Sequence, residues 1–142
     1  MKHFTKSDIK DLNKVKRLNI INSITGVKPG NLIGTINKEK TTNLAIFSSV
    51  VHLGSNPALL GFILRPQERV RKDTYNNILE NGSYTINHLP KTLTINGHYT
   101  SAKFHKDQSE FDYCKFTEWY ADNFKAPFVK ESNLNIGLKF QE

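Results

Sequence analysis

The sequence predicts an antiparallel β-barrel with inserted helices, in the all-β/α+β class. Short apolar segments follow one another with turn signals between them, whereas the helical segments are inserted and do not alternate with strands. The 142 residues suit one domain of ordinary size, and 37% of them are hydrophobic, which is enough for one core. The pattern argues against a doubly wound parallel sheet, which requires regular alternation of strand and helix.

The first predicted element is a helix over residues 6–17. Ile9, Leu12 and Val15 recur at helical spacing on one face, with lysine and aspartate on the other. A short hydroxyl side chain can accept a free amide hydrogen bond at a helix start, so Thr5 or Ser7 is expected to cap this helix.

Strands are expected through the next third of the chain. Branched and aromatic residues between turn signals predict them, and a nearly continuous apolar run predicts a strand buried on both faces. The expected elements are, in order, a turn at 27–30, a strand at 31–37, a hairpin loop at 37–41, a strand at 42–51, a break at 55–57 and the fully buried strand at 59–64.

Asp73 or Thr74 is expected to cap a helix that runs to about residue 81, with Gly82 at its C-terminal end. Its predicted inner stripe is formed by Tyr75, Ile78 and Leu79. Strict alternation then predicts strands at two places, and a mixed segment predicts a short helix and a loop between them. The strands are 83–89 and 134–140, and the mixed segment is 97–112.

The net charge of +7 is uneven along the chain. Residues 1–40 hold nine Lys/Arg against three acidic residues, which leaves only +1 for the rest. A basic excess can indicate nucleic-acid binding. Here no aromatic residues alternate with the lysines as a base-stacking platform would require. A solvated basic face is therefore the favoured interpretation, and no nucleic-acid partner is expected.

Several classes of site are not supported by any motif. The histidines have no metal-type spacing, Cys114 is the sole cysteine, and Ser101, His98 and Asp107 lack a nucleophile elbow. No glycine-rich dinucleotide or P-loop motif is present. No apolar run is long enough to cross a membrane, and the start does not look like an export signal. A cytoplasmic location is therefore expected, with no membrane partner.

Two segments could bind a ligand. Arg65, Arg69, Arg71 and Lys72 precede the helix start at Asp73-Thr74, and free amides with a positive dipole end favour a phosphate there. From their spacing alone, the same residues are also explained as an exposed loop with scattered positive charge that binds no phosphate. The strand segment 43–49 ends in paired hydroxyls that could meet a polar ring edge, although a plain strand ending in a turn explains it equally.

The order and spacing of these segments resemble a known family, the flavin reductase-like, FMN-binding split-barrel proteins. The similarity covers roughly residues 20–140. It is carried by Thr42–Ser49, Ser55–Phe62, Arg65-Pro66, Lys72-Asp73-Thr74 with Asn77-Ile78, Glu80–Asn87, Thr100–Phe104, Ser109–Asp112 and Ala126–Val129.

The resemblance implies an antiparallel, Greek-key FMN-binding split β-barrel with inserted helices that works as a homodimer. It implies non-covalent binding of FMN rather than FAD, in three groups of residues. Ala45, Ile46, Phe47, Ser48 and Ser49 would meet the isoalloxazine ring; Ser55 and Asn56 would line the ribityl and phosphate side; Lys72 and Thr74 would hold the phosphate, with Arg65 and Arg71 as weaker candidates.

The implied function is an FMN-binding oxidoreductase of flavin reductase type, which transfers hydride from NAD(P)H as co-substrate to flavin. No catalytic residue of the protein is expected, because hydride transfer to flavin requires no protein acid or base. The alternatives are a non-enzymatic flavin-binding module on the same fold and a basic nucleic-acid-binding barrel.

One departure from the family pattern concerns length. Residues 1–142 are expected to form a single flavin reductase-like FMN-binding domain that lacks the family's C-terminal strands. Because an open strand edge carries unpaired amides and carbonyls, another subunit or a continuation of the chain is expected to cover the edge after residue 140.

Overall fold

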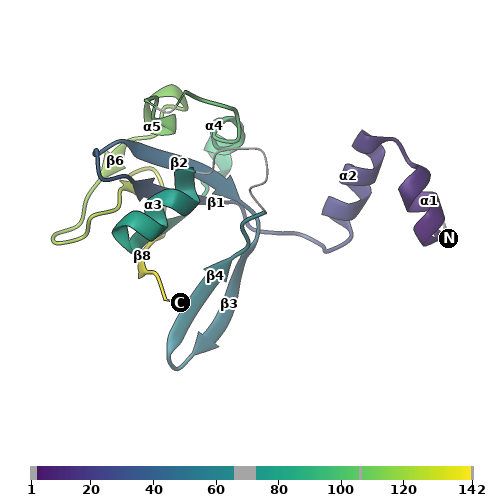
Figure 1. Ribbon diagram of the computed structural model, residues 1–142, viewed down its shortest axis with the longest axis horizontal. Coiled ribbons are helices and arrows are strands. Elements are labelled where there is room, and N and C mark those ends of the chain that lie inside the picture. The colour runs from purple at the N-terminus through teal and green to yellow at the C-terminus, as the bar shows by residue number, and fades with distance from the viewer. Residues whose placement is uncertain (1–2, 66–72, 106, 142) are drawn as a thin grey trace.

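The main sheet is antiparallel and has four strands. The computed structural model describes residues 3–65, 73–105 and 107–141 (Figure 1). The strand order is β2-β1-β5-β8, formed by β1 (Asn31–Ile36), β2 (Thr42–Phe47), β5 (Ser83–His88) and β8 (Asn135–Lys139). Each of these strands lies within a segment predicted to be a strand, so that part of the prediction is confirmed.

A second, two-stranded sheet leaves the first and extends away from it (Figure 1). It is formed by β3 (Val50–Ser55) and β4 (Ala58–Phe62), which pair in antiparallel with a register shift between His52 and Gly54. The single strand predicted over 42–51 is wrong, because β2 ends at Phe47 and a new strand begins at Val50.

The prediction that 59–64 is buried on both faces is also wrong. Leu59 is 38% exposed and Ile63 is 67% exposed. One face of β4 does pack, since Leu60 and Phe62 contact the cluster around Ile33 and Ile86. The other face has no cover among the described residues, because β4 pairs only with the equally exposed β3 in a two-stranded sheet.

The main sheet buries both of its faces. Leu32 and Ile33 are neighbours in β1 and fully buried, and their side chains enter different clusters because side chains alternate along a strand. The Leu32 cluster is covered by short elements late in the chain. The Ile33 cluster is covered by α3 (Asp73–Asn81) and the β3–β4 hairpin.

The helix α3 already begins at Asp73, so Asp73 and Thr74 lie in its first turn and do not precede it as a cap would. Gly82 adopts the left-handed conformation (φ +64°) expected at the C-terminal end. The predicted inner stripe is wrong in two of its three residues. Ile78 is buried, but Tyr75 and Leu79 are 42% and 52% exposed. The buried residues of α3 are Thr74, Asn77 and Ile78, because the sheet below the first turn of the helix is polar.

The elements over the Leu32 face are short. They are η1 (Lys91–Leu93), α4 (Thr94–Tyr99), α5 (Glu110–Tyr113), β6 (Glu118–Trp119) and β7 (Phe128–Val129). Phe111 of α5, Cys114 directly after it and Val129 of β7 pack with Leu32 and Leu44 in one cluster. The segment 97–112, where one short helix and a loop were predicted, holds the end of α4, a loop and the start of α5.

The N-terminal arm, residues 3–29, holds two helices and not the single predicted helix. They are α1 (Lys6–Asp11) and α2 (Lys14–Ser23). Leu12 is extended (ψ 145°), and the Asn13 side chain accepts from the amide of Lys16, so that a new helix starts there. Thr5 caps α1, as expected. Within the described part of the chain, no helix is long and apolar enough to cross a membrane.

Candidate functional site

The free edge of β2 is sealed by side chains from α4 and α5. The amide of Leu44 donates to Glu110 Oε2 at 3.0 Å, and the amide of Ile46 donates to Thr100 Oγ1 at 2.9 Å. Both acceptor residues are buried. An edge strand has backbone amides without a partner strand. These two contacts therefore give hydrogen-bond acceptors to amides that would otherwise be buried without one.

Replacing Thr100 with valine is expected to lower the free energy of unfolding by about 1–2 kcal/mol. Valine keeps the shape of threonine but removes the acceptor of the Ile46 amide and the donor to the Gly97 carbonyl. Hydrogen exchange of the Ile46 amide should be faster in this variant than in the wild type. The same substitution at Thr92, which is exposed, is the matched control. Unchanged exchange at Ile46 in Thr100→Val would contradict this assignment.

The segment that follows β2 is tied to the end of β4. Ser49 Oγ accepts from the amide of Ile63 at 3.2 Å and donates to the carbonyl of the same residue at 3.1 Å. Phe47 packs edge to face on Phe62, with ring centroids 4.9 Å apart. Ser48 is exposed beside them. The predicted ring-binding residues do not share one face, because Ile46 packs against the Leu32 cluster and Phe47 against the Ile33 cluster, whereas Phe47 and Ser49 both lie against the end of β4.

Thr74 is joined to β2 through a buried polar network. Its Oγ1 accepts from Asn43 Nδ2 at 3.1 Å, and the same amide group donates to Thr35 Oγ1 at 3.2 Å. Asn77 Nδ2 also donates to Thr35 Oγ1, at 3.1 Å. Thr74 is only 5% exposed. The network fixes the first turn of α3 over the strand that carries residues 45–47, so two of the predicted groups lie on one framework.

The third predicted group lies apart from the other two. Ser55 and Asn56 are at the turn of the β3–β4 hairpin, where Ser55 Oγ lies 3.0 Å from His52 Nε2. Ser55 is six residues after Ser49, which corresponds to roughly 20 Å of extended chain. Arg65 is exposed just after β4, and Arg71 and Lys72 lie outside the described residues.

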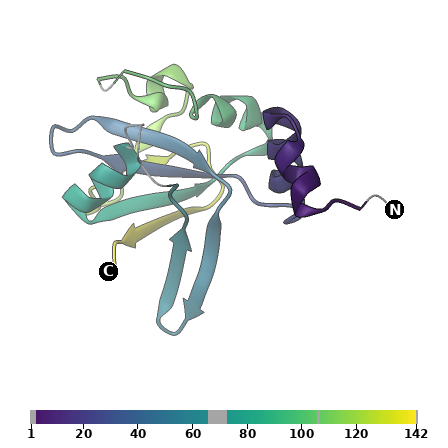
Figure 2. The ribbon, with the colours of Figure 1, turned by 45° about the vertical axis from the view of Figure 1, so that its right-hand side comes forward.

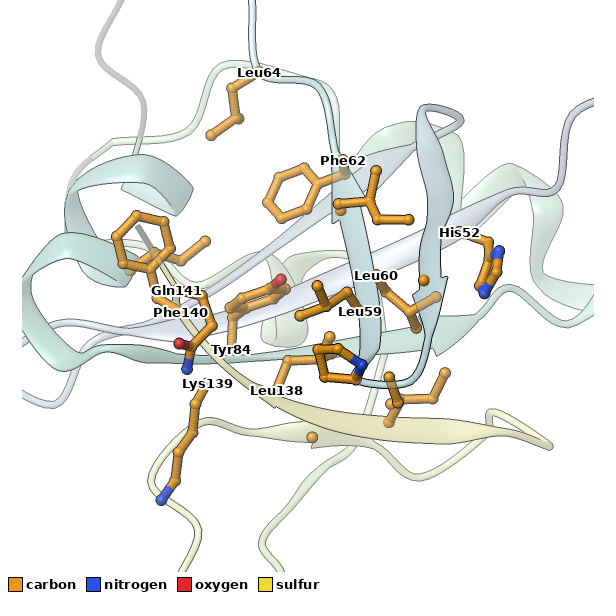
Figure 3. Close-up of a pocket in the computed structure, with 18 of the residues that line it drawn as sticks. His52, Leu59, Leu60, Phe62, Leu64, Tyr84, Leu138, Lys139, Phe140 and Gln141 are labelled. Carbon is orange, nitrogen blue, oxygen red and sulfur yellow. The ribbon is translucent and has the colours of Figure 1, made fainter.

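An apolar groove of about 1210 Å³ opens beside the β3–β4 hairpin. It lies between the β3–β4 hairpin, α3 and β8, with Tyr84 and Leu138 at its floor facing Leu59 and Phe62 (Figure 3). Its ionisable lining includes His52 and Lys139. Among the predicted site residues that the structure describes, Ser55 alone lines it. The groove and the predicted ring-binding surface are therefore different places.

Two buried ionisable groups have shifted proton affinities. Burial raises the pKa of the Cys114 thiol, and the nearby charge of Glu110 raises it further. Burial also raises the pKa of the Tyr84 phenol. Both groups are therefore neutral near pH 7. No cluster of three or more potential metal-ligating side chains occurs in the part of the chain that the structure describes.

Sequence reasoning assigned no role to Asn43, Thr100 or Glu110, which hold β2 and the start of α3 in place. The partners of these side chains are 31–66 residues away in the chain, so local periodicity carries no signal of them. Ser109 caps α5, because its Oγ accepts from the Phe111 amide at 3.3 Å.

Comparison with known proteins assigns this arrangement to a family. Residues 27–142 match the flavin reductase like domain. The chain belongs to this family. A protein of flavin reductase type with a split barrel domain, from Shewanella frigidimarina, is 45% identical and superposes with a TM-score of 0.93 over 100% of this chain and 70% of its own. The antiparallel split barrel predicted from the sequence is thereby confirmed.

More distant relatives share the flavin reductase-like fold. Nitrilotriacetate monooxygenase component B from Bacillus cereus is 20% identical, with a TM-score of 0.84 over 100% of this chain and 69% of its own. The Bacillus subtilis protein YwrF is 24% identical over 114 residues, which are 80% of this chain and 56% of YwrF. The chain thus spans little more than half the length of the curated relatives it matches. The family supports a flavin-related function.

Proposed function

We propose that the protein binds FMN and works as an oxidoreductase of flavin reductase type, with NAD(P)H as hydride donor. The match of residues 27–142 to the flavin reductase like domain is the observation that carries the proposal. We prefer FMN to FAD because the phosphate site that we propose at the start of α3 suits a terminal phosphate. An FMN-binding domain from Shewanella baltica has the same fold, with a TM-score of 0.67.

The residues at the end of β2 fit the edge of a flat ring. Residues 45–47 are half-buried, and the exposed Ser48 lies next to them. Ser49 is locked by its two hydrogen bonds to Ile63, so this surface is held in one conformation before a ligand arrives. A preformed surface loses little conformational entropy on binding, which favours affinity.

The phosphate is assigned to the start of α3. The first turn of this nine-residue helix carries amides without intrahelical partners and the positive end of the dipole, and Lys72 directly precedes it. Thr74 accepts from Asn43, which leaves its hydroxyl proton as a donor. Because the side chain of Thr74 is only 5% exposed, we assign Lys72 the larger contribution to binding of the phosphate.

Bound FMN would supply the redox chemistry, accepting hydride from the nicotinamide and passing electrons on. The part of the protein is to orient the ring along β2 and to neutralise the phosphate. Ser55 and Asn56 are assigned to the ribityl side only if the ligand extends along β3, since they lie at the far end of the hairpin.

The first test is the visible spectrum of the purified chain after addition of FMN and desalting. Retained absorption bands near about 370 and 450 nm are expected, because oxidised flavin absorbs there. A colourless protein would overturn the flavin site. Oxidation of NADH by the FMN-loaded protein then separates a reductase from a non-enzymatic flavin-binding module on the same fold.

Replacing Lys72 with alanine is expected to weaken FMN binding by about 10- to 100-fold, the size of one charge-assisted contact. Riboflavin binding should change little, since riboflavin lacks the phosphate. Titration of both ligands by flavin fluorescence measures the difference. The exposed Lys91, on η1, provides the matched Lys91→Ala control. An equal loss for FMN and riboflavin would show that the phosphate binds elsewhere.

A further inference from the structure

A buried network of polar side chains links α3 to the two strands that it packs against. Asn43 of β2 and Thr35 of β1 lie directly opposite each other in the sheet. Thr74 and Asn77 are three residues apart in α3, so they share one face of the helix, which lies against β1 and β2 (Figure 2). All of these side chains are buried, so the hydrogen bonds among them are shielded from water.

The hydrogen bonds of this network run in one direction. Asn43 Nδ2 donates to Thr35 Oγ1 at 3.2 Å and to Thr74 Oγ1 at 3.1 Å, which uses both hydrogens of the amide group. Asn77 Nδ2 donates to Thr35 Oγ1 at 3.1 Å. The carboxamides thus donate and the hydroxyl oxygens accept. A carboxamide can offer a neighbour either a donor or an acceptor, and Asn43 offers its donor to Thr74.

This direction decides what the Thr74 hydroxyl can do. A hydroxyl group has two lone pairs and one hydrogen. Because one lone pair of Thr74 Oγ1 accepts from Asn43, the hydrogen of the same group points away from that contact and can be donated elsewhere. Hydrogen bonds in a chain also polarise one another where water is excluded, so accepting from Asn43 makes the hydroxyl a stronger donor. The oxygens of an ionised phosphate are strong acceptors, and a donating hydroxyl suits them.

We propose that Asn43 is a positioning residue that sets the Thr74 hydroxyl to donate to the phosphate of FMN. This role rests on the proposed function, with the FMN phosphate at the start of α3. Asn43 acts through Thr74 and not by contact with the ligand. Side chains alternate along a strand, so Asn43 shares one face of β2 with Ala45 and Phe47. The strand assigned to the flavin ring therefore also carries the residue that prepares the phosphate site.

A purely structural role for Asn43 makes a different prediction. Thr35→Val provides the comparison, because valine keeps the shape of threonine and removes the acceptor of both carboxamides, but leaves the contact from Asn43 to Thr74 in place. Thr35→Val and Asn43→Leu should both lower the free energy of unfolding. The ratio of the affinities for FMN and riboflavin separates the two roles, since only FMN carries a phosphate and general loosening weakens both ligands alike.

The test measures this affinity ratio by titrating each variant with FMN and with riboflavin and following flavin fluorescence. Asn43→Leu keeps the branched shape of asparagine without a donor, and it is expected to lower the ratio about 10-fold, the size of one hydrogen bond to a charged acceptor. Asn43→Asp, whose ionised carboxylate can only accept from Thr74, is expected to lower the ratio at least as much. Thr35→Val should leave the ratio within about 2-fold of the wild type.

A double variant tests whether Asn43 acts through Thr74. Thr74→Val removes the hydroxyl, so Asn43→Leu added to it should change the ratio by less than about 2-fold, because residues that act as one unit are not additive. If Asn43→Leu does not fold, Asn43→Asp takes its place in the double variant, where simple repulsion of the phosphate by the new charge would persist without the hydroxyl.

The outcomes separate this role of Asn43 from the proposed function itself. A further loss of about 10-fold in the double variant would overturn the role of Asn43. So would a ratio that Asn43→Leu leaves unchanged, or one that Thr35→Val lowers as much as Asn43→Leu does; the phosphate site at α3 would then still stand. A wild-type chain that binds FMN no better than riboflavin, or binds neither, would overturn the phosphate site and the role of Asn43 together.

Discussion

Replacing Asn87 with alanine is expected to lower the free energy of unfolding by about 3 kcal/mol. The Asn87 side chain is fully buried and makes three contacts. Its Nδ2 donates to the Leu32 carbonyl at 3.0 Å and to Thr85 Oγ1 at 2.9 Å, and its Oδ1 accepts from the Val129 amide at 3.1 Å. Alanine leaves a buried carbonyl and a buried amide short of a partner, and it leaves a cavity.

Urea unfolding followed by circular dichroism measures this loss, and Asn133→Ala is the control because Asn133 is exposed. Since Asn87 joins β5 to β7, amide exchange at Val129 should accelerate most. A loss below about 1 kcal/mol, the net size of one ordinary hydrogen bond, would mean that water replaces the missing carboxamide.

Replacing Gly34 with alanine is expected to have an effect of similar size, about 3 kcal/mol or more. Gly34 is in the middle of β1, and a Cβ there would lie closer than 3.0 Å to the Pro127 carbonyl oxygen and to Thr85 Oγ1. The first of these atoms belongs to the backbone. Relief of the clash therefore requires the segment that leads into β7 to move away from the sheet, which also strains the Thr85 hydrogen bond to Pro127.

Gly61→Ala is the matched control, because Gly61 also lies in a strand. The Cβ added there would meet Leu53 Cδ1 at 2.9 Å, but Leu53 is 64% exposed and its side chain can rotate away. A loss within about 0.5 kcal/mol is therefore expected for the control. Equal stability of the two variants would contradict the close packing of the Pro127 carbonyl on Gly34.

The strands of the main sheet could be predicted because each carries its own signal. Ile86 and Tyr84 alternate with Thr85 and Asn87, and Ile136 and Leu138 alternate with glycine and lysine. The β3–β4 hairpin could not be predicted in this way. An apolar run such as 59–64 has the same appearance whether both of its faces are covered or one face is left open, since coverage depends on residues far away in the sequence.

Two helix predictions failed for a different reason. A 3.6-residue period continues across Leu12 and Asn13, yet the Asn13 side chain caps a new helix, and local capping overrode the pattern. In α3, Tyr75 and Leu79 were predicted to face the core together with Ile78. The helix instead places Thr74 and Asn77 on the polar residues of β1 and β2, which only the folded sheet brings together.

The candidate site was predictable only as separate motifs. The resemblance to the family placed residues 45–49 and 72–74 in one site, and the Asn43–Thr74 hydrogen bond connects the strand and the helix that carry them. The spacing did not reveal that Ser55 and Asn56 lie at the tip of a hairpin, because the strands β3 and β4 were not both predicted.

The sealed edge of β2 also has a consequence for synthesis on the ribosome. Glu110 is 66 residues later in the chain than Leu44, and Thr100 is 54 residues later than Ile46. At about 5–20 residues per second, β2 waits roughly 3–13 s after its own translation before Glu110 has been made. Until then the amides of Leu44 and Ile46 lack these partners, so slow codons between positions 47 and 110 should increase aggregation of newly made protein.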